Sequence, residues 1–260
     1  MDRGEGSPTV WVRVWALDPE HRGATNRATD GSDPGFDGGG QVAGAVGDLA
    51  QKPLRRAYER DPAAVPAWGE ETYPALRAQA RKHRATLFFL AEAGFDSEPR
   101  LGRTYGLKGQ TPVVPPTGQR QKINAISALT ASGAFGCQMY SERLNGQLLV
   151  HFLRAFLRGR SGRVYLIVDG HPAHKAQLVK DLIQELAGKL EIHFLPPYAP
   201  DLNPDEFVWG YMKTNGVSKK PLRKNESLKE RVQSDLNTLK GNRKLVRSFF
   251  GAKSVAYAGD

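Results

Sequence analysis

The sequence predicts an α/β fold in which a mixed β-sheet is flanked by helices. Two observations predict it. From residue 86 onward, short apolar runs of strand length alternate with amphipathic stretches of helical spacing. The most apolar run, Val164-Tyr165-Leu166-Ile167-Val168, is typical of a strand that is buried on both faces. With 260 residues, the chain is long enough for one main core with extensions.

Each predicted element has its own signal. The first strand contains Leu87-Phe88-Phe89-Leu90 and is bounded by Gly94, and Ala131-Ser132-Gly133 marks the turn of a hairpin. Strands are expected at 87–90, 123–129, 134–140, 164–168 and 192–195. Helices are expected at 148–157, at 178–186, from 203 onward and at 226–239. An antiparallel meander followed by right-handed crossovers is the element order of the ribonuclease H-like fold.

Outside this core the composition changes. Residues 1–46 are rich in Gly, Asp, Thr and Ser and are expected to form a poorly structured leader, because they cannot bury enough apolar area. Residues 47–83 are interpreted as a helical lead-in that packs on the ribonuclease H-like domain, 84–218. Residues 219–260 are interpreted as a basic, helical C-terminal extension.

The net charge restricts the class of partner. A formal charge of +10 and a pI near 9.7 suit a ligand made of phosphates, although a merely soluble basic surface is an equal alternative. Cys137 is the single cysteine, which excludes an intrachain disulfide and indicates a reducing compartment. No apolar run approaches the ~20 residues that span a bilayer, and the N-terminus does not resemble a signal peptide. The expectation is therefore a soluble intracellular protein without a membrane partner.

Two carboxylates stand at positions where chemistry is expected. Asp169 ends the most apolar strand, and ligands gather beyond the carboxyl ends of such strands. Glu206 follows Asn203, a good helix N-cap, in the first turn of the next helix. The two could share a pair of metal ions for phosphodiester chemistry. Alternatively, Asp169 is only a turn residue and Glu206 only closes a capping box on Asn203.

The sequence around these residues resembles the mariner-type transposases of bacterial insertion sequences, which are DDE superfamily endonucleases. The resemblance covers residues 51 to about 250. It rests on Leu166-Ile167-Val168-Asp169-Gly170-His171-Pro172-Ala173-His174, on Leu195-Pro196-Pro197-Tyr198-Ala199-Pro200-Asp201-Leu202-Asn203-Pro204-Asp205-Glu206, and on Trp209 and Lys213.

The resemblance implies that Asp169 and Glu206 are the second and third catalytic carboxylates. The implied cofactor is Mg²⁺, with Mn²⁺ as a substitute. The implied partners are double-stranded DNA, namely the insertion-sequence ends and the target, and a second copy in a homodimer. The implied compartment is the bacterial cytosol, near the nucleoid.

The match fails at the first carboxylate and at the N-terminus. Ala91 stands where the family carries its first catalytic aspartate. Glu92 is a weak substitute, because neighbouring side chains on a strand face opposite ways, and Asp96 is weaker still. We therefore expect a site of two carboxylates that binds metal poorly. Residues 1–46 lack the paired helices that recognise the element's ends, which suggests a truncated or frame-disrupted copy.

Other polar residues are candidates for contacts with DNA or metal. A zinc site at Asp169, His171 and His174 is disfavoured, because the resemblance makes both histidines residues that line the site. The basic candidates could equally be solvated. The candidates for DNA binding are His174, Lys213, Lys219, Lys220, Arg223 and Lys224.

Three functions remain open at this stage. The first is a transposase that cleaves and joins DNA with metal held by Asp169 and Glu206. The second, favoured by Ala91, is a catalytically disabled DNA-binding remnant of such an enzyme. The third is a cellular nuclease or recombination enzyme of the same fold, which the proline-rich string before Glu206 disfavours.

Overall fold

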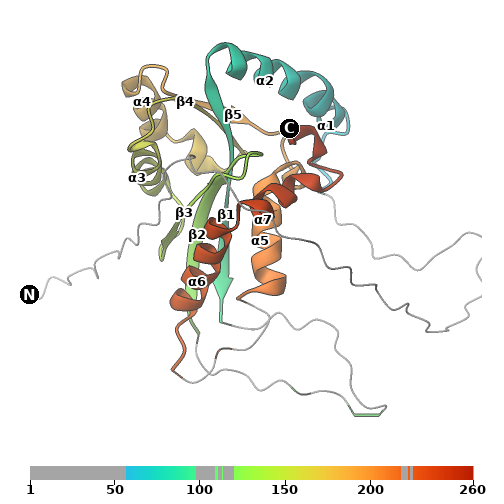
Figure 1. Ribbon diagram of the computed structural model, residues 1–260, viewed down its shortest axis with the longest axis vertical. Helices are drawn as coiled ribbons and strands as arrows, with labels where there is room; N and C mark the ends of the chain where they lie inside the picture. The colour runs from blue at the N-terminus through green and yellow to red at the C-terminus, as the bar shows by residue number, and fades with distance from the viewer. Residues whose placement is uncertain are drawn as a thin grey trace, which may run out of the picture.

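Five strands form one mixed sheet in the order β3-β2-β1-β4-β5 (Figure 1). The structure is a computed structural model that describes residues 57–97, 109, 110, 113, 120–217, 222 and 225–259. The predicted leader, 1–46, lies outside these residues. The strands are β1 (Ala85–Asp96), β2 (Lys122–Leu129), β3 (Phe135–Tyr140), β4 (Arg163–Val168) and β5 (Leu190–Phe194).

The strand directions confirm the predicted fold class. β1, β2 and β3 form an antiparallel meander, as the hairpin signal predicts, whereas β4 and β5 add to the other side of β1 in parallel. Strands alternate with helices after β3, and both faces of the sheet are covered. The fold is therefore the α/β, ribonuclease H-like mixed sheet flanked by helices.

One strand of this sheet changes its partner halfway along. β1 pairs with β4 from Ala85 to Phe89, and it pairs with β2 from Phe89 to Asp96. The strand thus runs through Gly94, where the sequence predicted its end, because β2 continues to supply backbone hydrogen bonds there. Beyond Phe89, the edge of β1 that faces β4 has no strand beside it among the described residues.

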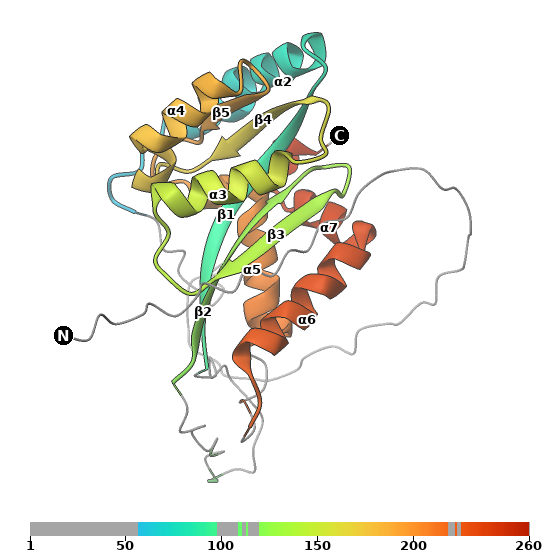
Figure 2. The same cartoon turned by 90° about the vertical axis from the view of Figure 1, so that its left-hand side faces the viewer.

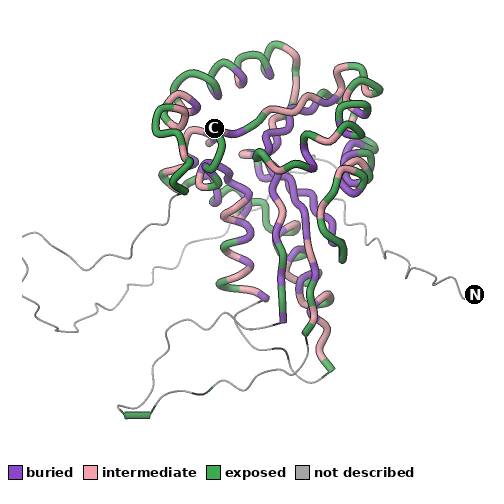
Figure 3. Tube along the Cα trace, turned by 180° about the vertical axis from the view of Figure 1, so that it is seen from behind, coloured by how far each residue is buried: buried purple, intermediate pink, exposed green. Residues whose placement is uncertain are grey.

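Two layers of helices sandwich the sheet (Figure 2). On one face, α3 (Gly146–Leu157) and α4 (Gln177–Glu185) bury a core with alternate residues of β1 and β4. The opposite core contains aromatic and aliphatic residues of the lead-in and of the C-terminal helices. The elements on this second face are α1 (Ala64–Ala67), a π-helical turn (Trp68–Thr72), α2 (Tyr73–Lys82), α5 (Pro204–Asn215), α6 (Leu228–Gly241) and α7 (Arg243–Ser248). Figure 3 shows the buried positions concentrated along the strands and the inner sides of the helices.

The lead-in and the C-terminal helices pack on each other as well as on the sheet. Tyr257, near the C-terminus, makes edge contacts with Trp68 and Tyr73, at ring-centroid distances of 6.4 and 4.8 Å. Arg60 forms a bidentate ion pair with Asp201, in the loop before α5. The segments at both ends of the described chain thus complete one core. Within the described residues, no helix has the length and apolar character needed to cross a membrane.

Candidate active site

The change of partner in β1 opens a gap in the sheet next to the end of β4. The last paired residues of these strands are Phe89 and Ile167, so Ala91 and Glu92 lie beyond the ladder on one side. Asp169, which follows the last residue of β4, lies beyond it on the other. In the described part of the chain no strand bridges β1 and β4 at this point, and the side chains of Glu92 and Asp169 approach one another there.

Asp169 is held in place by the turn that follows it. One oxygen, Oδ1, accepts hydrogen bonds from the backbone N–H of His171 (2.9 Å) and from Nδ1 of His174 (3.0 Å). Partial burial would raise the pKa of Asp169, but the hydrogen bonds from His174 and His171 outweigh it and lower the pKa below its usual value. Asp169 is therefore an ionised carboxylate at neutral pH, half exposed to solvent.

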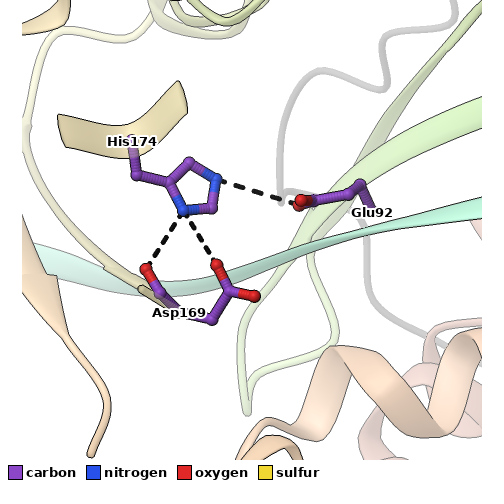
Figure 4. Close-up of side chains that lie close together, drawn as sticks. All are labelled: Glu92, Asp169 and His174. Atoms are coloured by element: carbon purple, nitrogen blue, oxygen red, sulfur yellow. Dashed lines mark hydrogen bonds and ion pairs between the residues drawn. The ribbon is translucent and has the colours of Figure 1, made fainter. Parts of the chain in front are cut away.

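His174 lies on a short 3-10 helix, Pro172–Lys175, that folds back over the gap. Its side chain is fully buried, so it is not presented to solvent as a DNA contact would require. Nδ1 lies 3.1 Å from the backbone oxygen of Asp169, and Nε2 lies 3.8 Å from Oε2 of Glu92 (Figure 4). Burial opposes a charged ring, but the hydrogen bond to Asp169 and the charge of Glu92 prevail and raise the pKa of His174.

Glu92 points toward Asp169 and His174, so the predicted outward orientation is wrong (Figure 4). Neighbouring side chains do alternate: Ala91 packs in the core under α5, whereas Glu92 is on the face that α3 and α4 cover. The error was in the face that was assumed to meet Asp169. Burial, with smaller effects from the neighbouring carboxylates, raises the pKa of Glu92 to about 7, although the nearby His174 lowers it in part.

Glu206 approaches the gap from the first turn of α5. Asn203 caps this helix by accepting from the backbone N–H of Asp205 (3.0 Å), and its own N–H donates to the carbonyl of Pro200. The capping box that was an alternative role for Glu206 is therefore not formed. Burial raises the pKa of Glu206, the nearby Lys213 opposes this, and the charge of Asp169 adds to it.

A residue that the sequence analysis did not single out, Asp205, attaches α5 to the open edge of β1. Its carboxylate is fully buried and accepts from the backbone N–H of Ala91 (2.8 Å) and from Oγ of Ser127 (2.6 Å). Asn203 donates to the carbonyl of Leu90 (2.9 Å). An acidic residue in the first helical turn is ordinary, so the sequence offered no signal for this role. Together these bonds replace the missing strand and fix the position of Glu206.

The remaining candidates divide into three groups. Lys213 is close enough to affect Glu206, and its Nζ lies 5.8 Å from the ring centre of Phe95. His171 caps the 3-10 helix through its ring, and Asp96 lies at the far end of β1 opposite Lys122. The other four basic candidates for DNA binding lie outside the described residues: Lys219, Lys220, Arg223 and Lys224.

Three side chains at the gap fit a divalent cation. Glu92, Asp169 and His174 each offer one ligand atom, and these atoms lie within 4.8 Å of one another. This overturns the expectation of a site with only two carboxylates, because Glu92 is within reach of an ion bound to Asp169. Oε2 of Glu92 and Nε2 of His174 are buried and have no hydrogen-bond partner among the described residues, which an ion would supply.

A fold that gathers acidic side chains at the end of a central strand is typical of enzymes that act on phosphodiesters with metal ions. Residues 86–229, more than half of the chain, match the family model described as DDE superfamily endonuclease, and the chain belongs to this family. None of the curated proteins compared with the chain matches it.

Solved structures of a transposase share the fold. The chain is similar to the Mos1 transposase paired-end complex with left transposon end, with 19% identity and a TM-score of 0.55. It is also similar to the Mos1 mariner paired-end complexes with Mn (21%, 0.54) and with Mg (19%, 0.55). Each likeness covers 83% of this chain and 68% of the Mos1 chain.

Proposed function

We propose that this chain is the catalytic part of a DNA transposase, which cleaves phosphodiester bonds and transfers DNA strands in a metal-dependent reaction. The observation that carries the proposal is the meeting of Glu92 and Asp169 at the gap between β1 and β4, with Glu206 approaching from α5. Membership of the DDE superfamily endonucleases supports the reaction class, and the fold shared with the Mos1 complexes supports transposition.

Asp169 and Glu206, joined by Glu92, would hold the metal, which the family resemblance implies to be Mg²⁺ with Mn²⁺ as a substitute. When bound, a divalent ion activates the attacking oxygen and stabilises the leaving one. The protein's part is to keep Asp169 ionised through His174 and the His171 N–H, and to fix Glu206 through the bonds of Asp205 to β1. Because Glu92 and Glu206 are ionised less readily than ordinary carboxyls, metal binding releases protons.

The proposed substrate is double-stranded DNA, both the ends of a mobile element and the target. A formal charge of +10 favours binding to phosphates, and Lys213 lies beside Glu206, where a phosphate oxygen would bind. We expect a homodimer, because two element ends must be brought together. We place the protein in the bacterial cytosol, where its substrate is.

One observation favours a second function, a catalytically disabled DNA-binding remnant. Ala91 occupies the position of the family's first aspartate. Its side chain packs against α5, which is the helix that carries Glu206. If Glu92 cannot replace that aspartate, the fold and the positive charge would persist without turnover.

Nicking of supercoiled plasmid in Mg²⁺ or Mn²⁺ separates the two functions. The unmodified chain, Glu92→Gln, Asp169→Ala and Ala91→Asp would be purified in parallel, and Asp169→Ala serves as the control for contaminating nuclease. We expect the unmodified chain to nick and both Glu92→Gln and Asp169→Ala to lose the activity. Nicking by Ala91→Asp alone would establish the disabled remnant instead. Joining of a 3′-hydroxyl end to a second DNA then distinguishes a transposase from a nuclease of the same family.

A further inference from the structure

Two buried atoms face each other across the candidate site without a hydrogen-bond partner in the part of the chain that is described. They are Oε2 of Glu92 and Nε2 of His174. Their separation of 3.8 Å is too long for a hydrogen bond. A divalent ion about 2.1 Å from each atom would separate them by about 4.2 Å when linear and by less when bent. The observed spacing lies within the range that two ligands of one ion span.

When the ring of His174 is neutral, its contacts select the tautomer that binds a metal through Nε2. A backbone oxygen can only accept, so the contact of Nδ1 with the Asp169 carbonyl, at 3.1 Å, places the ring hydrogen on Nδ1. A second acceptor, Oδ1 of Asp169, lies 3.0 Å from the same nitrogen. In metal sites, the ligating histidine usually donates its other N–H to a carboxylate or a backbone carbonyl in this way. In the neutral ring, the free lone pair of Nε2 is directed at Glu92.

Asp169 can complete the site with its second oxygen. Figure 4 shows one carboxylate oxygen of Asp169 bonded to the His174 ring, while the other takes no dashed line. The side chain of Asp169 is about half exposed, whereas that of His174 has no exposed surface. An ion held here would thus have protein ligands on its buried side and would be open to solvent or substrate beside Asp169.

We propose, building on the function proposed above, that Glu92, Asp169 and His174 form a mixed carboxylate–imidazole metal site that binds Mn²⁺ in preference to Mg²⁺. Mg²⁺ prefers oxygen ligands and keeps much of its water, whereas an imidazole nitrogen suits transition-metal ions better. Ala91 faces the opposite side of β1 from this cluster. The ligands beside Asp169 are therefore Glu92 and the imidazole of His174, in place of the family's first aspartate. The site differs from an all-carboxylate one in having a nitrogen ligand.

Pulsed electron paramagnetic resonance of Mn²⁺ bound to the full chain tests for that nitrogen directly. We expect a ¹⁴N coupling to Mn²⁺ in the unmodified protein and in His151→Gln, a matched control at an exposed position of α3. The coupling should disappear in His174→Gln. Titration of free Mn²⁺ should show that His174→Gln and Glu92→Gln each weaken binding at least about tenfold. Competition with Mg²⁺ should show a smaller loss of Mg²⁺ affinity in His174→Gln than of Mn²⁺ affinity.

Circular dichroism and urea unfolding would establish whether the buried substitution at His174 keeps the fold. If His174→Gln does not fold, Glu92→Gln decides, and unchanged Mn²⁺ affinity in that variant would overturn the proposed site. A ¹⁴N coupling that persists in folded His174→Gln would overturn it as well. Plasmid nicking by a chain without any ¹⁴N coupling would refute this site and leave the transposase function standing. A ¹⁴N coupling to Mn²⁺ in a chain that never nicks DNA would support this metal site and refute the transposase function.

Discussion

Replacing Glu92 by glutamine should make the metal-free protein more stable at alkaline pH. Burial raises the pKa of this carboxyl from 4.5 to about 7, so the folded protein resists its ionisation. Each pKa unit corresponds to about 1.4 kcal/mol, and the stability cost at pH 8 is therefore about 3 kcal/mol. Glutamine has the shape of the protonated acid and does not incur this cost.

The sign of the pH dependence follows from the raised pKa. Below pH 4.5 the carboxyl is protonated in both the folded and the unfolded chain, and the two proteins should be about equally stable. As pH rises toward about 7, the free energy of unfolding of the unmodified protein falls, because the unfolded chain ionises Glu92 more readily than the folded protein does. The free energy of unfolding of Glu92→Gln does not fall for this reason. The advantage of the variant should therefore grow between these values and level off above them.

Urea unfolding in EDTA at pH 5 and pH 8 measures the difference. Glu71→Gln makes the same chemical change on an exposed side chain and should alter stability by no more than about 0.5 kcal/mol at either pH. Mn²⁺ at about 100 times its dissociation constant should narrow the difference at pH 8, because it adds about 2.7 kcal/mol to the protein that binds it. A lower stability of Glu92→Gln than of the unmodified protein in EDTA at pH 8 would refute this reasoning. It would mean that burial of the charged Glu92 carboxylate does not destabilise the folded protein.

Two further perturbations test how the site is held. Asp205→Ala removes the buried acceptor of the Ala91 N–H and the Ser127 hydroxyl. In urea titrations it should lower the free energy of unfolding by about 2–4 kcal/mol. A loss below about 0.5 kcal/mol would mean that these bonds do not hold α5 on β1. Lys213→Met removes the cation that lowers the pKa of Glu206, so the NMR titration of that carboxyl should move to higher pH, and a move to lower pH would contradict the placement of Lys213.

The fold and part of the site could be predicted from the sequence because their signals are local. Apolar runs and helical stripes define the strands and helices, and their order predicts the mixed sheet. Asp169 and Glu206 stand out because each directly follows such an element boundary. The N-cap at Asn203 is also a local feature, and the structure has it.

The orientation of Glu92 and the role of Asp205 depend on contacts between distant segments. Alternation along β1 says that residues 91 and 92 face opposite ways, but not which of them meets Asp169. That is decided by where β4 stops pairing and by the turn that carries His174 over the gap. Asp205 positions α5 because it bonds to the part of β1 that no longer pairs with β4. No local sequence pattern predicts where that pairing ends.

The change of partner in β1 also has a consequence during synthesis of the chain. The carbonyl of Leu90 and the N–H of Ala91 are made more than a hundred residues before Asn203 and Asp205, which satisfy them. All five strands precede α5, so a nascent chain can build its sheet while this inner edge is still unpaired. Exposed strand edges recruit strands of other molecules. The first turn of α5 therefore protects this edge of β1 from pairing with other molecules. A chain that stops before residue 203 should accumulate as insoluble protein.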